Sequence, residues 1–196
     1  MQTDGVVNPM LLPPAYVLTI HRGEERRRQF RQAWPELAFE WFYGDDHLHY
    51  RETAAFAEYV ERHGSHKLLR IIPQHWLPRI FVTINHLRML RAALAEHPDV
   101  PGILVFEDDA VPTLPDVGPL IAAAIQRHPE RSRKFSGLPN AADWMSYACN
   151  YVTLPAARRM LAAEQLCNID WMFWTLARPD LAKPYPVEQR VGSLYQ

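Results

Sequence analysis

The sequence contains little cysteine and no long apolar run. Only Cys149 and Cys167 occur among 196 residues, which excludes the disulfide framework of a small secreted domain. Two free, buried thiols are the favoured interpretation, and one disulfide is the alternative. No apolar run approaches the roughly 20 residues of a membrane helix, and Met1–Gly5 lacks the basic and apolar regions of a signal peptide. These absences predict a cytoplasmic protein without a transmembrane segment.

Neither sign of charge predominates. Lys and Arg total 21 against 22 for Asp and Glu, so no overall field attracts nucleic acid, and no nucleic-acid partner is expected. There is no glycine-rich phosphate loop, no Cys-x-x-Cys pair and no Gly-x-Ser-x-Gly motif, which disfavours kinases, zinc modules and serine hydrolases. The length predicts one domain over residues 1–196.

Apolar runs and helical periodicity alternate along the chain. This alternation predicts an α/β fold with a mixed, mainly parallel sheet flanked by helices. In such sheets ligands bind at the carboxyl ends of strands. Residues 64–78 have no clear pattern and are expected to form a flexible loop. The predicted strands are 15–20, 39–43, 102–106 and 147–153, and the predicted helices are 24–33, 52–62, 79–97, 117–128 and 155–163.

Three consecutive carboxylates follow the clearest apolar strand. Glu107, Asp108 and Asp109 come directly after residues 102–106, and their mutual repulsion favours a hard divalent cation such as Mn²⁺ or Mg²⁺. Because side chains alternate along an extended segment, Glu107 and Asp109 are expected to share one side as metal ligands. Asp108 would then reach a ribose or support the ligands. The alternative is a solvated acidic turn without a metal.

The motifs around this run resemble glycosyltransferase family 25, the lipooligosaccharide galactosyltransferases. Residues 103–110 are similar to the core acidic motif of that family, and residues 16–26 resemble its first strand and the arginine-containing turn that follows. Residues 84–90 are similar to its helix with a Ser-His pair, although Asn85 stands where serine is usual. Further similar blocks follow in the order of the family: 151–161, 168–171, 186–189 and Ser193.

This resemblance implies a GT-A-like (Rossmann-like) fold and a nucleotide-sugar donor, often UDP-galactose. It also implies a carbohydrate acceptor such as a lipopolysaccharide core. A lipid-linked acceptor would bring the protein to the inner membrane surface, where Arg26-Arg27-Arg28 could aid peripheral docking.

Individual roles rest on this resemblance and on chemistry. Inverting sugar transfer needs a base for the acceptor hydroxyl, and Asp170 is the candidate, with Asp143 as a second. An N-cap or a buried hydrogen-bonding acid is the alternative for Asp170. Asp108 is a further catalytic candidate. The substrate-binding candidates are Arg22, Arg26, Asn85, His86 and Gln189.

Other side chains have simpler interpretations. Trp171 and Trp174 could stack on a sugar, but a core position is favoured for both. Residues 45–49 mix Asp and His, and a surface turn is favoured there over a second metal site.

Two alternatives to a transferase remain open. One is a non-catalytic module that binds a nucleotide-sugar or a glycan, and it is motivated by Asn85 and by the short chain. The other is a metal-dependent phosphohydrolase, because clustered acids serve those enzymes too.

Overall fold

The computed structural model describes residues 12–63, 77–137, 142, 146–163 and 168–190. The strands are β1 (Ala15–Ile20), β2 (Glu40–Gly44), β3 (Gly102–Glu107), β4 (Ala110–Pro112), β5 (Arg133–Lys134), β6 (Ser136–Gly137), β7 (Cys149–Thr153), β8 (Asp180–Leu181) and β9 (Val187–Gln189). The helices are α1 (Glu24–Ala33), η1 (His47–Glu52), α2 (Ala54–His63), α4 (Leu77–Glu96), α5 (Val117–Arg127), α6 (Leu154–Leu161), α7 (Ile169–Met172) and η3 (Phe173–Ala177).

The sheet is mixed rather than mainly parallel. Its strand order is β2-β1-β3-β7-β5-β8. The β1–β2, β1–β3 and β5–β8 pairs are parallel, whereas β7 runs antiparallel to both of its neighbours, β3 and β5. The prediction assumed a helical crossover before every strand, but antiparallel neighbours need none, and no helix separates β5 from β7 in the part of the chain that the structure describes. The α/β class is correct, and the mainly parallel sheet was wrong.

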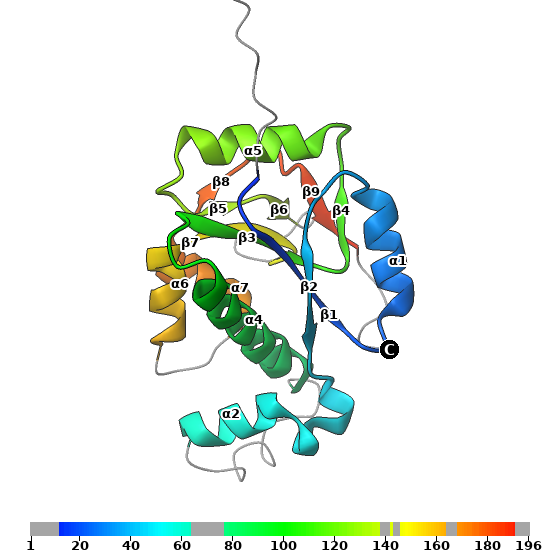
Figure 1. Cartoon of the computed structure of the whole chain (residues 1–196), viewed down its shortest axis with the longest axis vertical. Helices are drawn as coiled ribbons and strands as arrows, with labels where there is room; N and C mark the ends of the chain where they lie inside the picture. Colours follow the sequence, from blue (N-terminus) through cyan, green and yellow to red (C-terminus); the bar gives the residue numbers. More distant parts are fainter. Residues whose placement is uncertain (1–11, 64–76, 138–141, 143–145, 164–167, 191–196) are drawn as a thin grey trace, which may run out of the picture.

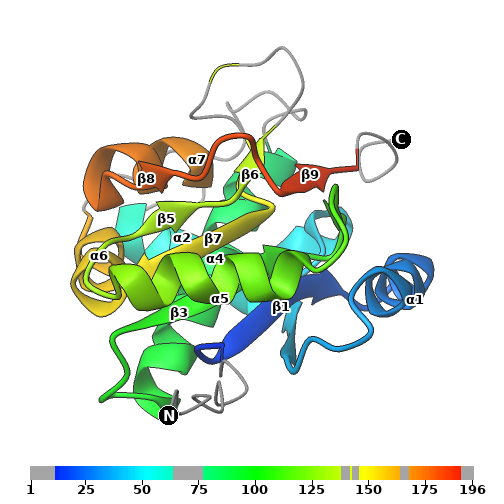
Figure 2. The ribbon, with the colours of Figure 1, turned by 90° about the horizontal axis from the view of Figure 1, so that it is seen from above.

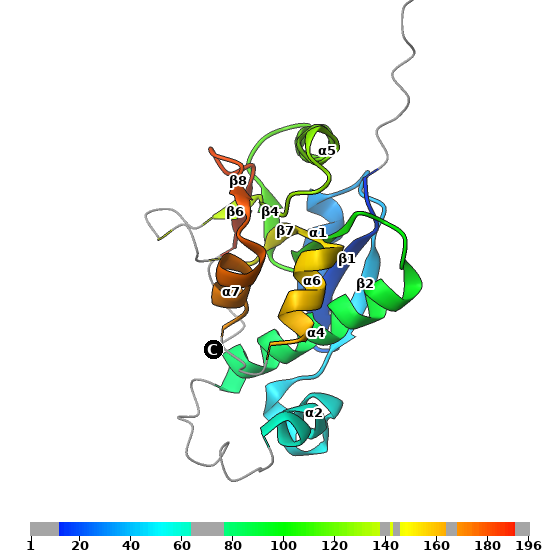
Figure 3. The same ribbon diagram turned by 90° about the vertical axis from the view of Figure 1, so that its left-hand side faces the viewer.

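The central strands are apolar because both faces of the sheet are covered. Along β3, Ile103 and Val105 pack into one core while Leu104 and Phe106 pack into the other. Helices α4, α6 and α7 contribute to the first core, and α1 and α5 contribute to the second. Figure 1 shows α4 crossing the sheet, and Figure 3 shows it beside α6. Figure 2 shows α5 and α1 from above. A strand buried on both faces reads as a continuous apolar run.

A second, smaller sheet joins distant parts of the chain. Strands β4, β9 and β6 pair in that order, so the segment after β3 contacts the last described residues. Gln189 lies in register with Ala110, directly after the acidic run. The small sheet therefore brings the C-terminal strand to the carboxyl end of β3.

The structure bears on three further predictions: the flexible loop, the cysteines and the membrane helix. Residues 64–76 of the expected flexible loop lie outside the described residues, and Leu77 and Pro78 open α4. Cys149 is a buried free thiol, as predicted, while Cys167 lies outside the described residues. None of the described helices is both long and apolar enough to cross a membrane.

The core interpretation of Trp171 was wrong. Its side chain is 47% exposed, and Trp174 is only half-buried. Met172 and Phe173, between them, are buried. Residues three apart in a helix lie on the same side. Because Met172 and Phe173 face the core, Trp171 and Trp174 share the outer side.

Gly102 and Gly118 form a matched pair for testing the packing of β3. A Cβ at Gly102 would lie 2.6 Å from the buried Tyr151 ring, whereas a Cβ at Gly118 would meet nothing within 4 Å. Gly102→Ala is expected to lower the free energy of unfolding by about 1–3 kcal/mol through overpacking. Gly118→Ala, in the first turn of α5, is expected to leave it unchanged or raise it by up to about 1 kcal/mol. Urea denaturation of both variants is the measurement, and equal effects would contradict this packing.

Candidate functional site

The acidic run lies where the carboxyl ends of two parallel strands meet. Glu107 ends β3, and Asp108 and Asp109 form the turn that leads to β4. The Asp108 N–H donates to the Leu18 carbonyl of β1 at 3.1 Å. The parallel pairing of β1 and β3 thus fixes the backbone of the run at one edge of the sheet.

Asp108 is held by the protein itself. One carboxylate oxygen accepts from Arg26 Nη1 at 2.8 Å, and the other accepts from Thr19 Oγ1 at 2.6 Å. Its side chain is only 4% exposed. Asp108 therefore ties β1, α1 and β3 together. Thr19 is a site residue that the sequence did not indicate.

Glu107 and Asp109 lie on the same side of the run. Gln189 of β9 donates through Nε2 to Glu107 Oε2 at 2.9 Å and lies 3.3 Å from Asp109 Oδ2. The other oxygen of Asp109, Oδ1, is buried and has no hydrogen-bond partner among the described residues. Arg26 Nη2 lies 3.9 Å from Asp109 Oδ2. Two carboxylates thus converge beside the guanidinium of Arg26.

Both of these carboxyl groups are shifted toward the neutral form. Burial raises the pKa of Glu107, and the charge of Asp108 raises it further, against the charges of Arg26 and Lys134. Burial likewise raises the pKa of Asp109, with an added contribution from the charge of Glu107. A buried carboxyl group with a raised pKa gains stability from a neighbouring cation.

His86 of α4 contacts the acidic run. Its Nε2 lies 3.0 Å from Glu107 Oε1, and the ring is fully buried. Burial lowers the pKa of His86 to about 3, against the charge of Asp170. Its Nδ1 is buried and has no hydrogen-bond partner among the described residues. His86 is therefore neutral at physiological pH and supports Glu107.

Asp170 lies in the same electrostatic environment. It stands in the first turn of α7, where the Asn168 side chain caps the helix by accepting from the Asp170 N–H at 2.9 Å. Burial raises the pKa of Asp170 to about 7, and the charge of Glu107 raises it further, against Lys134, His86 and Arg79. Its Oδ1 is buried without a hydrogen-bond partner in the described part of the chain. An acid with a pKa near neutrality suits general-base chemistry. Asp143, the second candidate, lies outside the described residues.

Lys134 and Tyr147 complete the site and were not predicted. The Lys134 side chain is buried, its ammonium donates to the Ser146 carbonyl, and its charge lowers the pKa of both Glu107 and Asp170. The Tyr147 ring packs edge-on against His86, with centroids 4.6 Å apart. Burial and the charges of Glu107 and Asp170 raise the pKa of Tyr147 well above its usual value. Short strands and loops carry these residues, so no periodic pattern marked them.

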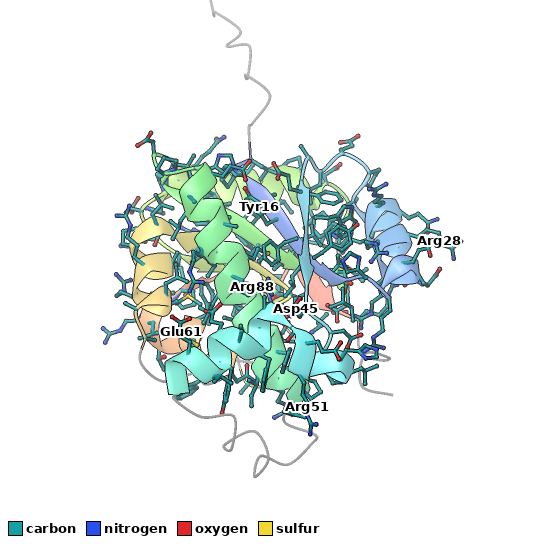
Figure 4. All side chains as sticks on the ribbon, turned by 60° about the horizontal axis from the view of Figure 1, so that its bottom comes forward. Tyr16, Arg28, Asp45, Arg51, Glu61 and Arg88 are labelled. Carbon is teal, nitrogen blue, oxygen red and sulfur yellow. The ribbon has the colours of Figure 1, made fainter. Side chains whose placement is uncertain are left out.

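Two substrate-binding candidates contact the turn after β2 instead. The Asn85 side chain bonds both the N–H and the carbonyl of Asp45, at 3.1 and 2.9 Å. Arg88 donates to the carboxylate of Asp45 at 2.6 Å, and Figure 4 shows the two side chains together. Arg22 pairs with Asp46. Asp45 and Asp46 accordingly lie in the turn after β2, with partners from α4 and from the segment after β1, and residues 47–49 begin η1.

The three consecutive arginines do not form one exposed patch. Arg26 pairs with Asp108, and Arg27 donates to the carbonyls of Ile20 and His21. Only Arg28 projects from α1 into solvent (Figure 4), where it pairs with Glu25. The expected membrane-docking patch is therefore reduced to a single exposed arginine.

The chain matches no protein-family model and no curated protein at a significant level. The resemblance to family 25 glycosyltransferases therefore stays a prediction from the ordered motifs of the sequence.

The donor set at the acidic run fits a hard divalent cation that also binds a ligand. Glu107 and Asp109 offer carboxylate oxygens, and the buried Oδ1 of Asp109 is unused. In the described ranges, the one set of three His, Asp or Glu side chains with ligand atoms within 4.8 Å of one another is Glu40, Glu96 and His97, far from the run at the amino end of β2. A metal at residues 107–109 would thus take two protein ligands and complete its shell with water and phosphate oxygens, which is usual for Mg²⁺.

Proposed function

We propose that the protein is a metal-dependent glycosyltransferase that moves a sugar, galactose in the first instance, from a nucleotide-sugar to a glycan acceptor. One observation carries the proposal. Two buried carboxyl groups of raised pKa converge at the carboxyl end of a central strand, beside the acid Asp170, whose pKa is about 7. In this proposal the metal, the donor diphosphate and the acceptor base are neighbours.

Each side chain has a role in this proposal. Glu107 and Asp109 hold Mn²⁺ or Mg²⁺, which when bound screens the charge on the departing nucleotide diphosphate. Gln189 orients both carboxylates, and His86 fixes the conformation of Glu107 through its 3.0 Å contact. Asp108 holds Arg26 at 2.8 Å, with its guanidinium near the expected diphosphate. Asp170 accepts the proton of the acceptor hydroxyl as that oxygen attacks the sugar.

The fold is compatible with the GT-A type that the resemblance implies. The site lies at the carboxyl ends of parallel strands, where α/β sheets bind ligands. One antiparallel strand, β7, borders β3, and a small second sheet brings Gln189 to the site. Asn85 and Arg22 hold the turn after β2 at the same edge of the sheet.

A nucleotide-sugar binding module without turnover is the second candidate. The observation in its favour is that Arg26 and Thr19 occupy both oxygens of Asp108. Incubation of the protein and Mn²⁺ with several nucleotide-sugars separates the two candidates by the amount of nucleotide diphosphate released. Turnover supports the transferase, and tight binding without release supports the module. Release of inorganic phosphate from simple esters would instead support a phosphohydrolase.

Asp170→Asn tests the proposed base. The substitution is expected to lower transfer by roughly 100-fold or more, because base catalysis contributes at least that factor. UDP affinity should be unchanged, because an asparagine side chain keeps the shape of the aspartate and the base does not hold the donor. The measurements are kcat with an accepted glycan and calorimetric Kd for UDP. Wild-type activity in Asp170→Asn would exclude Asp170 as the base.

A further inference from the structure

A hollow on the outer side of α7 and η3 has no role in the proposed donor chemistry. Its volume is about 520 Å³, which lies in the range of small-molecule sites. It is formed by α7, η3 and the residues that follow, and its lining residues are Trp171, Trp174, Thr175, Arg178 and Pro179. The size is suitable for a sugar residue or two.

Two tryptophans face this hollow. Trp171 is 47% exposed and Trp174 is half-buried, so both keep a large ring surface accessible to a ligand. The indole combines an apolar face with an N–H donor, which suits the apolar C–H face and the hydroxyl groups of a pyranose. The π-helical turn η3 carries Trp174, and such turns are frequent at functional sites.

Arg178 adds a positive charge at a strained position. Its backbone is left-handed, with φ of 48°, a conformation that glycine adopts at lower cost. The side chain is exposed and has neither an ion pair nor a hydrogen bond in the part of the chain that the structure describes. A planar guanidinium of this kind binds carboxylate or phosphate in a bidentate manner.

The hollow and the candidate base share one helix. Asp170 and Trp171 are successive residues of α7. The Asp170 carboxyl group has a buried oxygen and interacts with the charge of Glu107, whereas Trp171 is exposed toward the hollow. A saccharide seated on the tryptophans would therefore be a part of the acceptor other than the hydroxyl group that loses its proton to Asp170.

We propose that this hollow binds a saccharide bearing an anionic group, either a carboxylate or a phosphate, as part of a glycan acceptor. The ring stacks on Trp171 and Trp174, and the anionic group pairs with Arg178. The role as acceptor rests on the proposed transferase function, while the binding itself requires neither metal nor nucleotide.

Saturation-transfer NMR with three monosaccharides tests the inference. Galacturonic acid, galactose 6-phosphate and neutral methyl galactoside are titrated into wild type without metal. The two acidic sugars are expected to bind several-fold more tightly than the neutral one, and the tighter of the two identifies the anionic group. Equal affinity for all three, or no binding of any, would overturn the inference.

Variants locate the binding. Trp174→Ala and Arg178→Gln are expected to lose most of the acidic-sugar affinity, and Arg178→Gln should leave the weak neutral affinity unchanged. Leu120→Ala and Arg127→Gln, on the exposed side of α5, are the matched controls and should bind as wild type does. Arg178→Gly should lose affinity without a fall in Tm, because glycine suits the left-handed backbone. Retained affinity in Arg178→Gln and Arg178→Gly would overturn the assignment.

The outcome is separable from that of the transferase proposal. Binding of UDP with Mn²⁺ but of no acidic sugar would overturn this inference and leave the transferase standing. Binding of acidic sugars without binding of UDP would support the ligand class of the hollow and remove the transferase.

Discussion

Asp109→Asn is expected to abolish metal-dependent binding of UDP while making the protein more stable. Removing one of two protein ligands should weaken Mn²⁺-dependent binding by roughly 100-fold or more, since even supporting residues cost up to that factor. The pKa of Asp109 is raised by burial and by the charge of Glu107, so its ionisation destabilises the fold. At about pH 8 the free energy of unfolding should rise by at least about 1 kcal/mol, because one pKa unit corresponds to about 1.4 kcal/mol.

The pH dependence of this gain in stability follows from the upward shift of the Asp109 pKa. A carboxyl group with a raised folded-state pKa contributes stability that is present at low pH and lost as pH rises through that pKa. The variant and wild type should therefore differ little near pH 4 and increasingly toward about pH 8. Asp99→Asn, at an exposed carboxylate before β3, is the control and should change neither quantity. Unaltered Mn²⁺-dependent affinity in Asp109→Asn would contradict the metal assignment.

Lys134→Met is expected to cause the largest loss of stability. Lys134 is buried, and its charge lowers the pKa of Glu107 and Asp170. Removing one member of a buried charge cluster leaves the others uncompensated, at a cost of about 3 kcal/mol. Chemical denaturation at about pH 8 is the measurement, because the carboxyl groups tend to ionise there.

A measurement of Lys134→Met at lower pH serves as the control. The pKa of Asp170 is about 7, so near pH 5 the folded protein holds this group neutral and Lys134 loses one of its attractive partners. The stability gap between wild type and Lys134→Met should narrow or reverse there. A gap of the same size at both pH values would show that Lys134 acts by packing and by its bond to Ser146, not through the carboxyl groups.

The long elements could be predicted because burial imposes a pattern on them. Residues 102–106 form a continuous apolar run because β3 is covered on both faces, and the run from Ile80 to Leu94 has helix spacing because α4 packs on the sheet. Strands of two or three residues, such as β5 and β6, are too short to show any period. The direction of β7 depended on its neighbours in space, which no local pattern encodes.

The candidate site was predicted from the run of acids and from the family resemblance, and its other members gave no signal in the sequence. The run at residues 107–109 is visible because three acids follow a strand, and the structure adds His86 and Gln189, which the family resemblance had singled out. Lys134 and Tyr147 are distant in sequence and lie on short or irregular segments. They reach the site because β5 and β7 pair next to β3. Asn85 was predicted to bind substrate, but its side-chain amide instead bonds the backbone N–H and carbonyl of Asp45.

Calorimetric titration of UDP into the wild-type protein, with and without Mn²⁺, tests the central claim most directly. A nucleotide-sugar site at Glu107 and Asp109 predicts saturable binding of UDP that requires Mn²⁺, and binding of UDP-galactose at the same site in competition. Absence of UDP binding in the presence of Mn²⁺, or binding that is indifferent to the metal, would contradict a metal-dependent nucleotide-sugar site at the end of β3.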